Sequence, residues 1–380
     1  MHEITESNVV GYLRDTGRLP PEVPATGTTL AWGVSNIVLR VHPDSGPDLV
    51  VKQSREKLRT KADWFSRLDR IWREIDVMKA LAPLLPEGAV PRVLFEDRAN
   101  YVFGMDAIDV EHVVWKEELL SGRADAGVAA TLGEYLATIH RETAGVREFE
   151  TAFNDRQVFD ELRIDPYYRY IAGVHEDLRP AIQSLIDETL ATNCCIVHAD
   201  FSPKNVLITE VTHSSVWPGS NEESPRLFDS SSDTRTGIQP ERHVSLVDFE
   251  TGHYGDPAFD HGFFLAHLLL KTIKHREHLD RYLRLARVFW DRYSFHAVRR
   301  ADNPQASSKL FPIARVESQA VKHLGACLLA RIDGKSTIDY LSLQEQNIAR
   351  DFARELLQTP PRQLETAFAG LWNRLAEFPQ

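Results

Sequence analysis

Two short apolar runs end directly in polar side chains that could carry out chemistry. Residues 194–197 lead into HADFSPKN at 198–205, and residues 244–247 lead into Asp248. Transfer of a phosphoryl group requires a carboxylate near the attacking hydroxyl and metal ligands near a triphosphate. The spacing H-x-D-x-x-x-x-N offers Asp200 as the proton acceptor and Asn205 as a magnesium ligand. Asp248 offers a second hard oxygen ligand, so we predict that Asn205 and Asp248 bind the metal.

A simpler interpretation of the same residues is structural. Asp200 and Asp248 could cap the ends of two strands, and Asn205 could satisfy a turn. Two carboxylates after two buried strands, together with an asparagine, exceed what loops usually need, so the chemical interpretation is favoured.

These motifs resemble those of the aminoglycoside phosphotransferase and choline kinase-like family, which shares the protein-kinase-like fold. The resemblance rests on HADFSPKNVLI at 198–208, VDFE at 247–250 and GDPAFD at 255–260, and it extends over about residues 28–345. It implies an ATP- and Mg²⁺-dependent kinase that phosphorylates a hydroxyl of a small metabolite, such as a sugar, an aminoglycoside-like compound or an amino alcohol. It also implies that His198 supports the catalytic loop and that Asp260 braces this loop or caps a helix from His261.

The resemblance further assigns residues to nucleotide binding. Lys52, in VVKQ, stands where the family places a lysine on the phosphates, and Glu74 is its expected partner on the next helix. Glu56 is a competing partner, but it follows Lys52 too closely. The stretch AWGVSN matches the phosphate-covering GGxSN loop at Gly33, Ser35 and Asn36 and departs from it at Trp32. Backbone groups of Met105 and Ala107, in the hinge at 105–107, are expected to hold the adenine.

A softer resemblance is to methylthioribose kinases, through a leading helix, VVKQ and the tripeptide DFE. Those kinases hold their substrate with a pair of arginines, whereas the corresponding stretch here, ARIDGK at 330–335, contains only Arg331. Arg331 and Asp333 are candidates for substrate contact. Asp280 and Glu317 are further acids that could meet an aminoglycoside.

The order of predicted elements indicates an α+β fold with two lobes. Residues 1–105 form the N-lobe, with a leading helix at 5–16, a hairpin at 28–41, the lysine strand at 48–52, a helix at 62–82 and strands at 90–94 and 101–105. Residues 106–380 form a mainly helical C-lobe. The polar stretch 210–243 is expected to be a surface insertion.

Composition restricts the remaining classes of function. The formal charge of −11 opposes binding to nucleic acid or to an anionic membrane, although it suits a cationic small molecule as well as simple solubility. Three cysteines without paired C-x-x-C motifs and no long apolar run favour a cytoplasmic protein. A protein kinase is disfavoured because no APE signature follows DFE. A catalytically silent, nucleotide-binding interaction module is the alternative function, although all four key residues are present.

Overall fold

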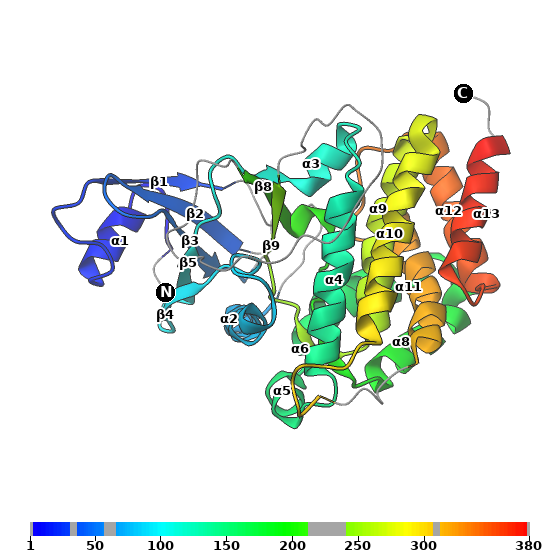
Figure 1. Ribbon diagram of the computed structural model, residues 1–380, viewed down its shortest axis with the longest axis horizontal. Coiled ribbons are helices and arrows are strands. Elements are labelled where there is room, and N and C mark those ends of the chain that lie inside the picture. The colour runs from blue at the N-terminus through cyan, green and yellow to red at the C-terminus, as the bar shows by residue number, and fades with distance from the viewer. Residues whose placement is uncertain (1–2, 31–35, 57–65, 212–240, 307–311, 378–380) are drawn as a thin grey trace, which may run out of the picture.

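The computed structural model describes residues 3–30, 36–56, 66–211, 241–306 and 312–377. Figure 1 shows a sheet-containing N-lobe beside a larger helical C-lobe. The predicted two-lobed α+β fold is therefore confirmed. Gly33, Ser35 and Trp32 lie outside the described residues, as does most of the predicted insertion at 210–243.

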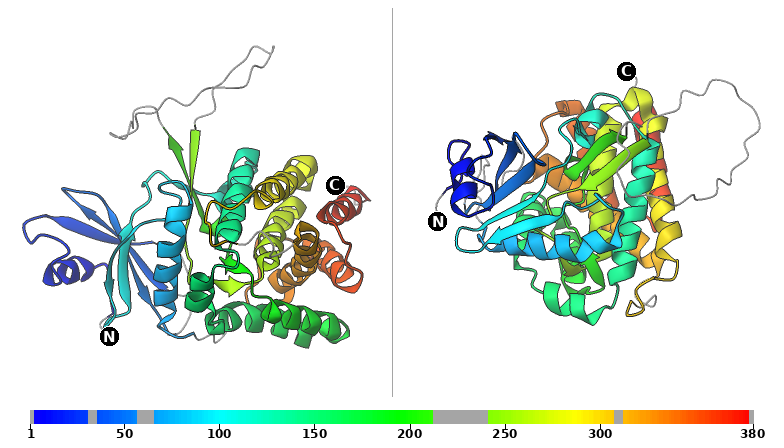
Figure 2. Two further views of the ribbon diagram at one scale, coloured as in Figure 1. Left: turned by 60° about the horizontal axis from the view of Figure 1, so that its bottom comes forward. Right: turned by 60° about the vertical axis from the view of Figure 1, so that its left-hand side comes forward.

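The N-lobe is built on a five-stranded antiparallel sheet with the order β1-β2-β3-β5-β4. Its strands are β1 (Ala25–Thr29), β2 (Asn36–Pro43), β3 (Leu49–Ser54), β4 (Val93–Asp97) and β5 (Val102–Asp106). Helix α2 (Arg70–Leu81) packs against β3 and β4, and α1 (Val9–Asp15) packs against β1 and β2 (Figure 2).

The two faces of this sheet differ because side chains alternate along a strand. Leu49 and Val51 of β3 join the small core beneath α1. Val50 and Lys52 point to the opposite face, toward the cleft between the lobes. The period of two thus places the lysine amine inside the cleft.

Two predicted helices are shorter than expected. The leading helix begins at Val9 rather than residue 5. The helix expected from residue 62 begins at Arg70, and residues 66–69 are not helical. Ser66 Oγ instead donates a hydrogen bond to Glu161 of the C-lobe at 2.9 Å, so residue 66 makes a contact between the lobes where helix was predicted.

The C-lobe consists mainly of helices packed around α9. Its helices are α3 (Trp115–Leu120), α4 (Ala126–Thr143), α5 (Arg147–Phe153), α6 (Gln157–Phe159), α7 (Tyr170–Val174), α8 (Arg179–Ala191), α9 (Pro257–Lys274), α10 (Leu279–Ala297), α11 (Ile313–Asp333), α12 (Leu343–Gln358) and α13 (Leu364–Glu377), with a π-helical segment at Asp160–Arg169. Helix α9 is buried from Pro257 to Ile273, as expected for a helix that is apolar on nearly every side. None of the described helices combines the length and apolar character needed to cross a membrane.

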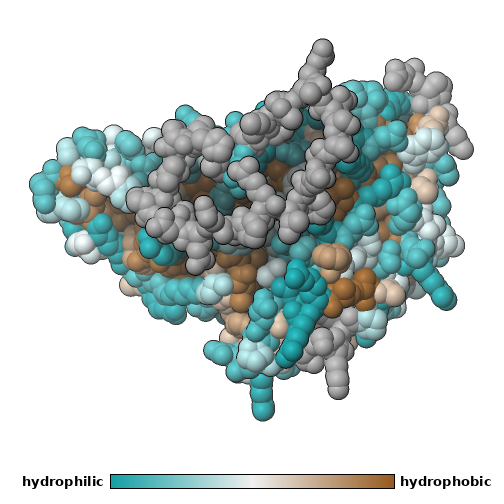
Figure 3. All heavy atoms as spheres, in the orientation of Figure 1, coloured by the Kyte–Doolittle hydropathy of each residue, from teal (hydrophilic) through white to brown (hydrophobic). Residues whose placement is uncertain are grey.

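Short strands carry the polar motifs. Strand β7 (Cys195–Val197) pairs with β10 (His253–Gly255), and β8 (Val206–Val211) lies between β6 (Val113–Val114) and β9 (Glu241–Leu246). The 198–205 motif connects β7 to β8, and Asp248 follows β9. On the face shown in Figure 3, hydrophilic residues cover most of the surface, and hydrophobic residues are seen mainly toward the middle of the molecule.

Candidate active site

The loop after β7 is held by a buried carboxylate of α9. Asp260 accepts hydrogen bonds from the backbone N–H groups of His198 at 2.8 Å and Ala199 at 2.7 Å. Ala199 has a φ of 58°, a left-handed conformation that a non-glycine residue adopts only when its surroundings hold it there. His198 Nδ1 also accepts a hydrogen bond from the backbone N–H of Asp200 at 3.2 Å. The predicted supporting roles of Asp260 and His198 are therefore present.

The predicted cap is one helical turn away from where the sequence placed it. Helix α9 begins at Pro257, and its N-cap is Asp256, whose carboxylate accepts the N–H of Ala258 at 3.0 Å. Asp260 lies within the first turn of α9 and bonds the loop instead. Asp256 therefore caps the helix, and Asp260, four residues later, supports the loop.

Asp200 is a buried carboxylate with both oxygens engaged. Oδ1 pairs with the Arg163 guanidinium at 2.8 Å, and Oδ2 pairs with the Lys204 amine at 2.9 Å. Burial alone would raise the pKa of Asp200, but these two cations lower it below its ordinary value. Asp200 is thus ionised at neutral pH and can accept a proton.

Asn205 shares this carboxylate. Its amide nitrogen donates to the backbone oxygen and to Oδ2 of Asp200, both at 2.9 Å. These bonds direct the NH₂ group toward Asp200, and the amide oxygen, which carries the lone pairs, is the atom that can act as a metal ligand.

Asp248 meets the N-lobe through the predicted lysine. Lys52 Nζ lies 2.8 Å from Asp248 Oδ1 and 2.8 Å from Glu74 Oε1, so the expected Lys52–Glu74 pair is present. Burial disfavours the charge on Lys52, yet Asp248 and Glu74 raise its pKa above the ordinary value. Burial likewise opposes the charge on Asp248, but Lys52 and Lys204 lower the pKa of this carboxyl. Lys52 and Asp248 therefore form a charged link between the lobes, whereas burial raises the pKa of Glu74 to about 7 against the opposing effect of Lys52.

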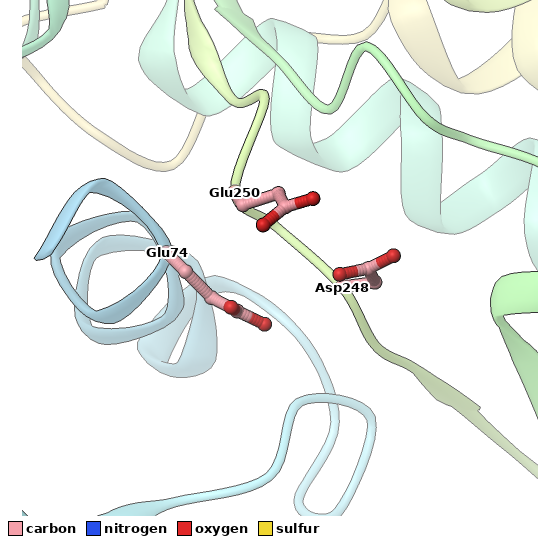
Figure 4. Close-up of side chains that lie close together, drawn as sticks. All are labelled: Glu74, Asp248 and Glu250. Carbon is pink, nitrogen blue, oxygen red and sulfur yellow. The ribbon is translucent and has the colours of Figure 1, made fainter. Parts of the chain in front are cut away.

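A third carboxylate that the sequence did not single out completes this cluster. Oxygens of Glu74, Asp248 and Glu250 lie within 4.8 Å of one another. Figure 4 shows Glu74 on α2 and the other two on the segment that follows β9. Glu250 Oε2 accepts hydrogen bonds from Arg70 Nε at 3.1 Å and from Asn36 Nδ2 at 2.9 Å. The sequence feature that could have pointed to Glu250 is its place as the last residue of the VDFE motif.

Arg163 was also missed, and for a different reason. It reaches Asp200 from the π-helical segment, which precedes the 198–205 motif by more than thirty residues and carries no recognisable pattern. Its guanidinium Nε also donates to the backbone oxygen of Ala199 at 2.7 Å. The contact depends entirely on tertiary packing.

A cleft of about 900 Å³, open at its mouth, joins these groups to an apolar wall. The cleft is lined by the polar residues Asn36, Lys52, Glu74, Asn205 and Asp248 and by the apolar residues Leu30, Val38, Val50, Met105, Leu207 and Val247. Met105 of the predicted hinge lines the cleft, whereas the side chain of Ala107 packs against the core.

The candidate substrate contacts fall into two groups. Asp333 is paired with Arg350 at 2.7 Å and with His175 at 2.9 Å. Asp280 accepts a hydrogen bond from the Trp372 indole, and Glu317 accepts one from the backbone N–H of Leu364. These acids therefore serve helix packing. Arg331 instead donates a hydrogen bond to Tyr167 Oη at 3.1 Å, and the ring of Tyr167 lies close to the guanidinium of Arg163.

The architecture is a protein-kinase-like fold with a cleft between two lobes. It is similar to the solved structure of choline kinase from Cryptosporidium parvum Iowa II, with a TM-score of 0.51 and 11% identity over 98% of this chain and 100% of that chain. It is also similar to amicoumacin kinase in complex with AMP-PNP, Ca²⁺ and Ami, with a TM-score of 0.50 and 13% identity over 94% and 95% of the two chains. At these identities the likeness concerns the fold.

Sequence comparison defines the family. Residues 26–216, half of the chain, match the phosphotransferase enzyme family, and the protein belongs to this family of small-molecule kinases. Methylthioribose kinase of Pectobacterium carotovorum subsp. carotovorum (strain PC1) is 24% identical over 90% of this chain and 88% of its own length. Its counterpart in Pectobacterium atrosepticum is 25% identical over 70% of this chain and 65% of its own length. The predicted family and the softer resemblance to methylthioribose kinases are confirmed.

Proposed function

We propose that this kinase transfers the γ-phosphoryl group of ATP to a hydroxyl of a small metabolite, with Asp200 as the proton acceptor. The observation that carries the proposal is the meeting of three segments that are distant in sequence. Lys52 bridges Glu74 and Asp248, and Asn205 bonds Asp200. ATP as the donor follows from membership of the family.

The nucleotide occupies the apolar wall and the lysine end of the cleft. Val38, Val50 and Leu207 provide a flat apolar surface for the adenine, and backbone groups of the hinge, from Met105 to Ala107, bind its edge. Lys52 binds the phosphates, and Glu74 holds the amine in place. Asn36 borders the same cleft, and Gly33 and Ser35 belong to the proposed phosphate-covering loop.

The carboxylate cluster suits a magnesium ion. Asn205 and Asp248 would hold the ion, with Glu250 adjacent, and these hard oxygen donors are the ligands that magnesium prefers. Among the described residues, no hydrogen-bond donor contacts the buried Glu74 Oε2, so this carboxyl oxygen is not committed to another group. When bound, Mg²⁺ neutralises charge on the phosphate oxygens.

Asp200 acts on the acceptor. The hydroxyl oxygen forms a bond to the γ-phosphorus, the bond from this phosphorus to the β–γ bridging oxygen breaks, and the hydroxyl proton passes to Asp200. Arg163 and Lys204 keep Asp200 ionised, and they hold the carboxylate in one orientation. The products are ADP and a phosphate ester.

A phosphotransfer assay with radiolabelled ATP and a panel of metabolites tests this proposal. The panel includes methylthioribose, the compound in the name of the relatives. Asp200→Asn keeps the shape of the side chain and removes the base, and we expect it to slow transfer by about 10²–10⁴-fold. Asp160→Asn, at an exposed pair with Arg169, is the matched control. Transfer that Asp200→Asn leaves unchanged would remove the base assignment, and a wild type that binds ATP without transfer would favour the silent interaction module.

A further inference from the structure

A group of basic side chains lies in the C-lobe and is linked through Tyr167 to Arg163, the partner of Asp200. Lys271 and His267 come from α9, Arg331 comes from the last turn of α11, and Lys116 comes from α3. We call these four residues the basic cluster.

The basic cluster is continuous with the proposed catalytic group. Arg331 donates to Tyr167 Oη at 3.1 Å, and the ring of Tyr167 lies 5.8 Å from the guanidinium carbon of Arg163. Arg163 in turn pairs with Asp200. The ring of His267 packs at 5.1 Å against Phe263, whose ring also lies 5.4 Å from the Arg163 guanidinium. The basic cluster is therefore linked to the proton acceptor through Tyr167 and Arg163.

Lys271 is buried without a carboxylate partner. Only 1% of the surface of Lys271 is exposed to solvent. Its amine donates to the backbone oxygen of His267 at 3.1 Å and lies 5.4 Å from the centre of the Tyr340 ring. Over the described ranges, no carboxylate comes within 4.0 Å of this amine or of the Arg331 guanidinium. By contrast, nearby Lys335 pairs with Asp165.

Three polar atoms around this amine also lack partners. His267 Nε2, Arg331 Nε and Tyr340 Oη are buried and make no hydrogen bond within the described part of the chain. The whole His267 residue is only 7% exposed. Buried donors are nearly always satisfied in native proteins, so a set of unsatisfied donors indicates an absent acceptor.

Electrostatics agrees with this arrangement. Burial, the largest cause, and the charges of Lys116 and Arg331 together lower the pKa of Lys271 to about 7. Burial also lowers the pKa of His267, with contributions from Arg331 and Lys271. Like charges that repel one another in a buried site are stabilised by an anion between them.

We infer that the basic cluster binds a carboxylate or phosphate group carried by the acceptor substrate, an inference that rests on the proposed function. Such a group supplies several acceptor oxygens to Lys271, Arg331, His267 and Tyr340. It also anchors the acceptor beside Asp200, so that a hydroxyl on the same molecule reaches the proton acceptor. Cationic acceptors, such as aminoglycosides and amino alcohols, are repelled by the same cluster.

Matched acceptors test this inference. Glycerate is compared with glycerol, and ribose 5-phosphate with ribose, under saturating ATP and Mg²⁺. We expect kcat/KM to be at least about tenfold higher for the anionic member of a pair that serves as substrate. Lys271→Met retains the length of the side chain without its charge. It should lower kcat/KM for the anionic member at least about tenfold, mostly through KM, and change the value for the neutral member less than about threefold.

The control is Arg374→Gln, which removes one positive charge from an exposed pair with Glu355 on the distant helix α13. Melting temperatures of both variants show that they are folded. A preference for the neutral member, with Lys271→Met affecting both members equally, overturns the inference and leaves the proposed function intact, because transfer still occurs.

Direct binding separates the two proposals when no acceptor in the panel is phosphorylated. Calorimetric titration with inorganic phosphate, with AMP-PNP and Mg²⁺ present, measures the anion site without any reaction. Binding that weakens at least about tenfold in Lys271→Met and Arg331→Gln, and remains unchanged in Arg374→Gln, supports the inference. Equal binding by all four proteins overturns it.

Discussion

Asp260 should be among the least replaceable polar residues of the C-lobe, because it supports the catalytic loop from inside. Its side chain accepts two buried backbone N–H groups, from His198 and Ala199, and lies 3.3 Å from His140 Nε2. Each backbone donor left without an acceptor costs about 1–3 kcal/mol. Asp260→Asn keeps one acceptor oxygen and should lower the free energy of unfolding by about 1–3 kcal/mol. Asp260→Ala loses both acceptors and should lower it by about 2–6 kcal/mol.

The catalytic effect follows from the backbone. Ala199, held at a φ of 58°, directly precedes Asp200, so relaxation of this residue moves the carboxylate. A displacement of about 1 Å in a catalytic group can slow the reaction about 10²-fold. We therefore expect kcat to fall by this amount in Asp260→Asn, while the KM for ATP changes little.

Urea unfolding, hydrogen exchange and steady-state kinetics check these expectations. Exchange at the amides of residues 198 and 199 should accelerate in Asp260→Asn. The control is Asp160→Asn, at an exposed bidentate pair with Arg169, where loss of the charge should cost no more than about 1 kcal/mol. If Asp260→Asn is as stable as this control and exchange at the two amides is unchanged, the bracing role is refuted.

Three further predictions concern the lobe link, the basic cluster and helix packing. Glu74→Gln removes one of the two carboxylates on Lys52, and the KM for ATP should rise about tenfold or more; an unchanged KM in steady-state assays would contradict the pairing role. Burial lowers the pKa of Lys271 to about 7 from 10.5, so the unfolded chain binds more protons between these values. Wild type should therefore gain roughly 4 kcal/mol of stability relative to Lys271→Met as the pH rises from 7 to 10.5, and a pH-independent difference in urea midpoints would refute this. In Gly262→Ala the new Cβ would lie 2.2 Å from a side-chain atom of α11, and this clash should lower the free energy of unfolding in urea by about 1–3 kcal/mol. The control is Gly173→Ala, whose new Cβ would have no atom within 4 Å and should not change the stability. Equal stability of the two variants would count against close α9–α11 packing.

The sequence alone determined the chemistry of the loops. Asp200 and Asn205 lie five residues apart in one turn, and such short-range spacing already limits how their side chains can meet. Lys52 was assigned from the resemblance to the family, and alternation along β3 accounts for the face that its side chain occupies. The order of strands and helix in the N-lobe and the helical character of the C-lobe followed from hydrophobic periodicity, which is likewise a local property.

Tertiary structure decided the contacts that join distant segments. The approach of Arg163 to Asp200, the bonds from Arg70 and Asn36 to Glu250, and the start of α2 at Arg70 all depend on how the lobes pack. The basic cluster is a further case, since its members come from three helices and only Arg331 was singled out in the sequence. Charges of this kind acquire meaning only when folding removes them from water and brings them together, because burial makes an unpaired charge costly.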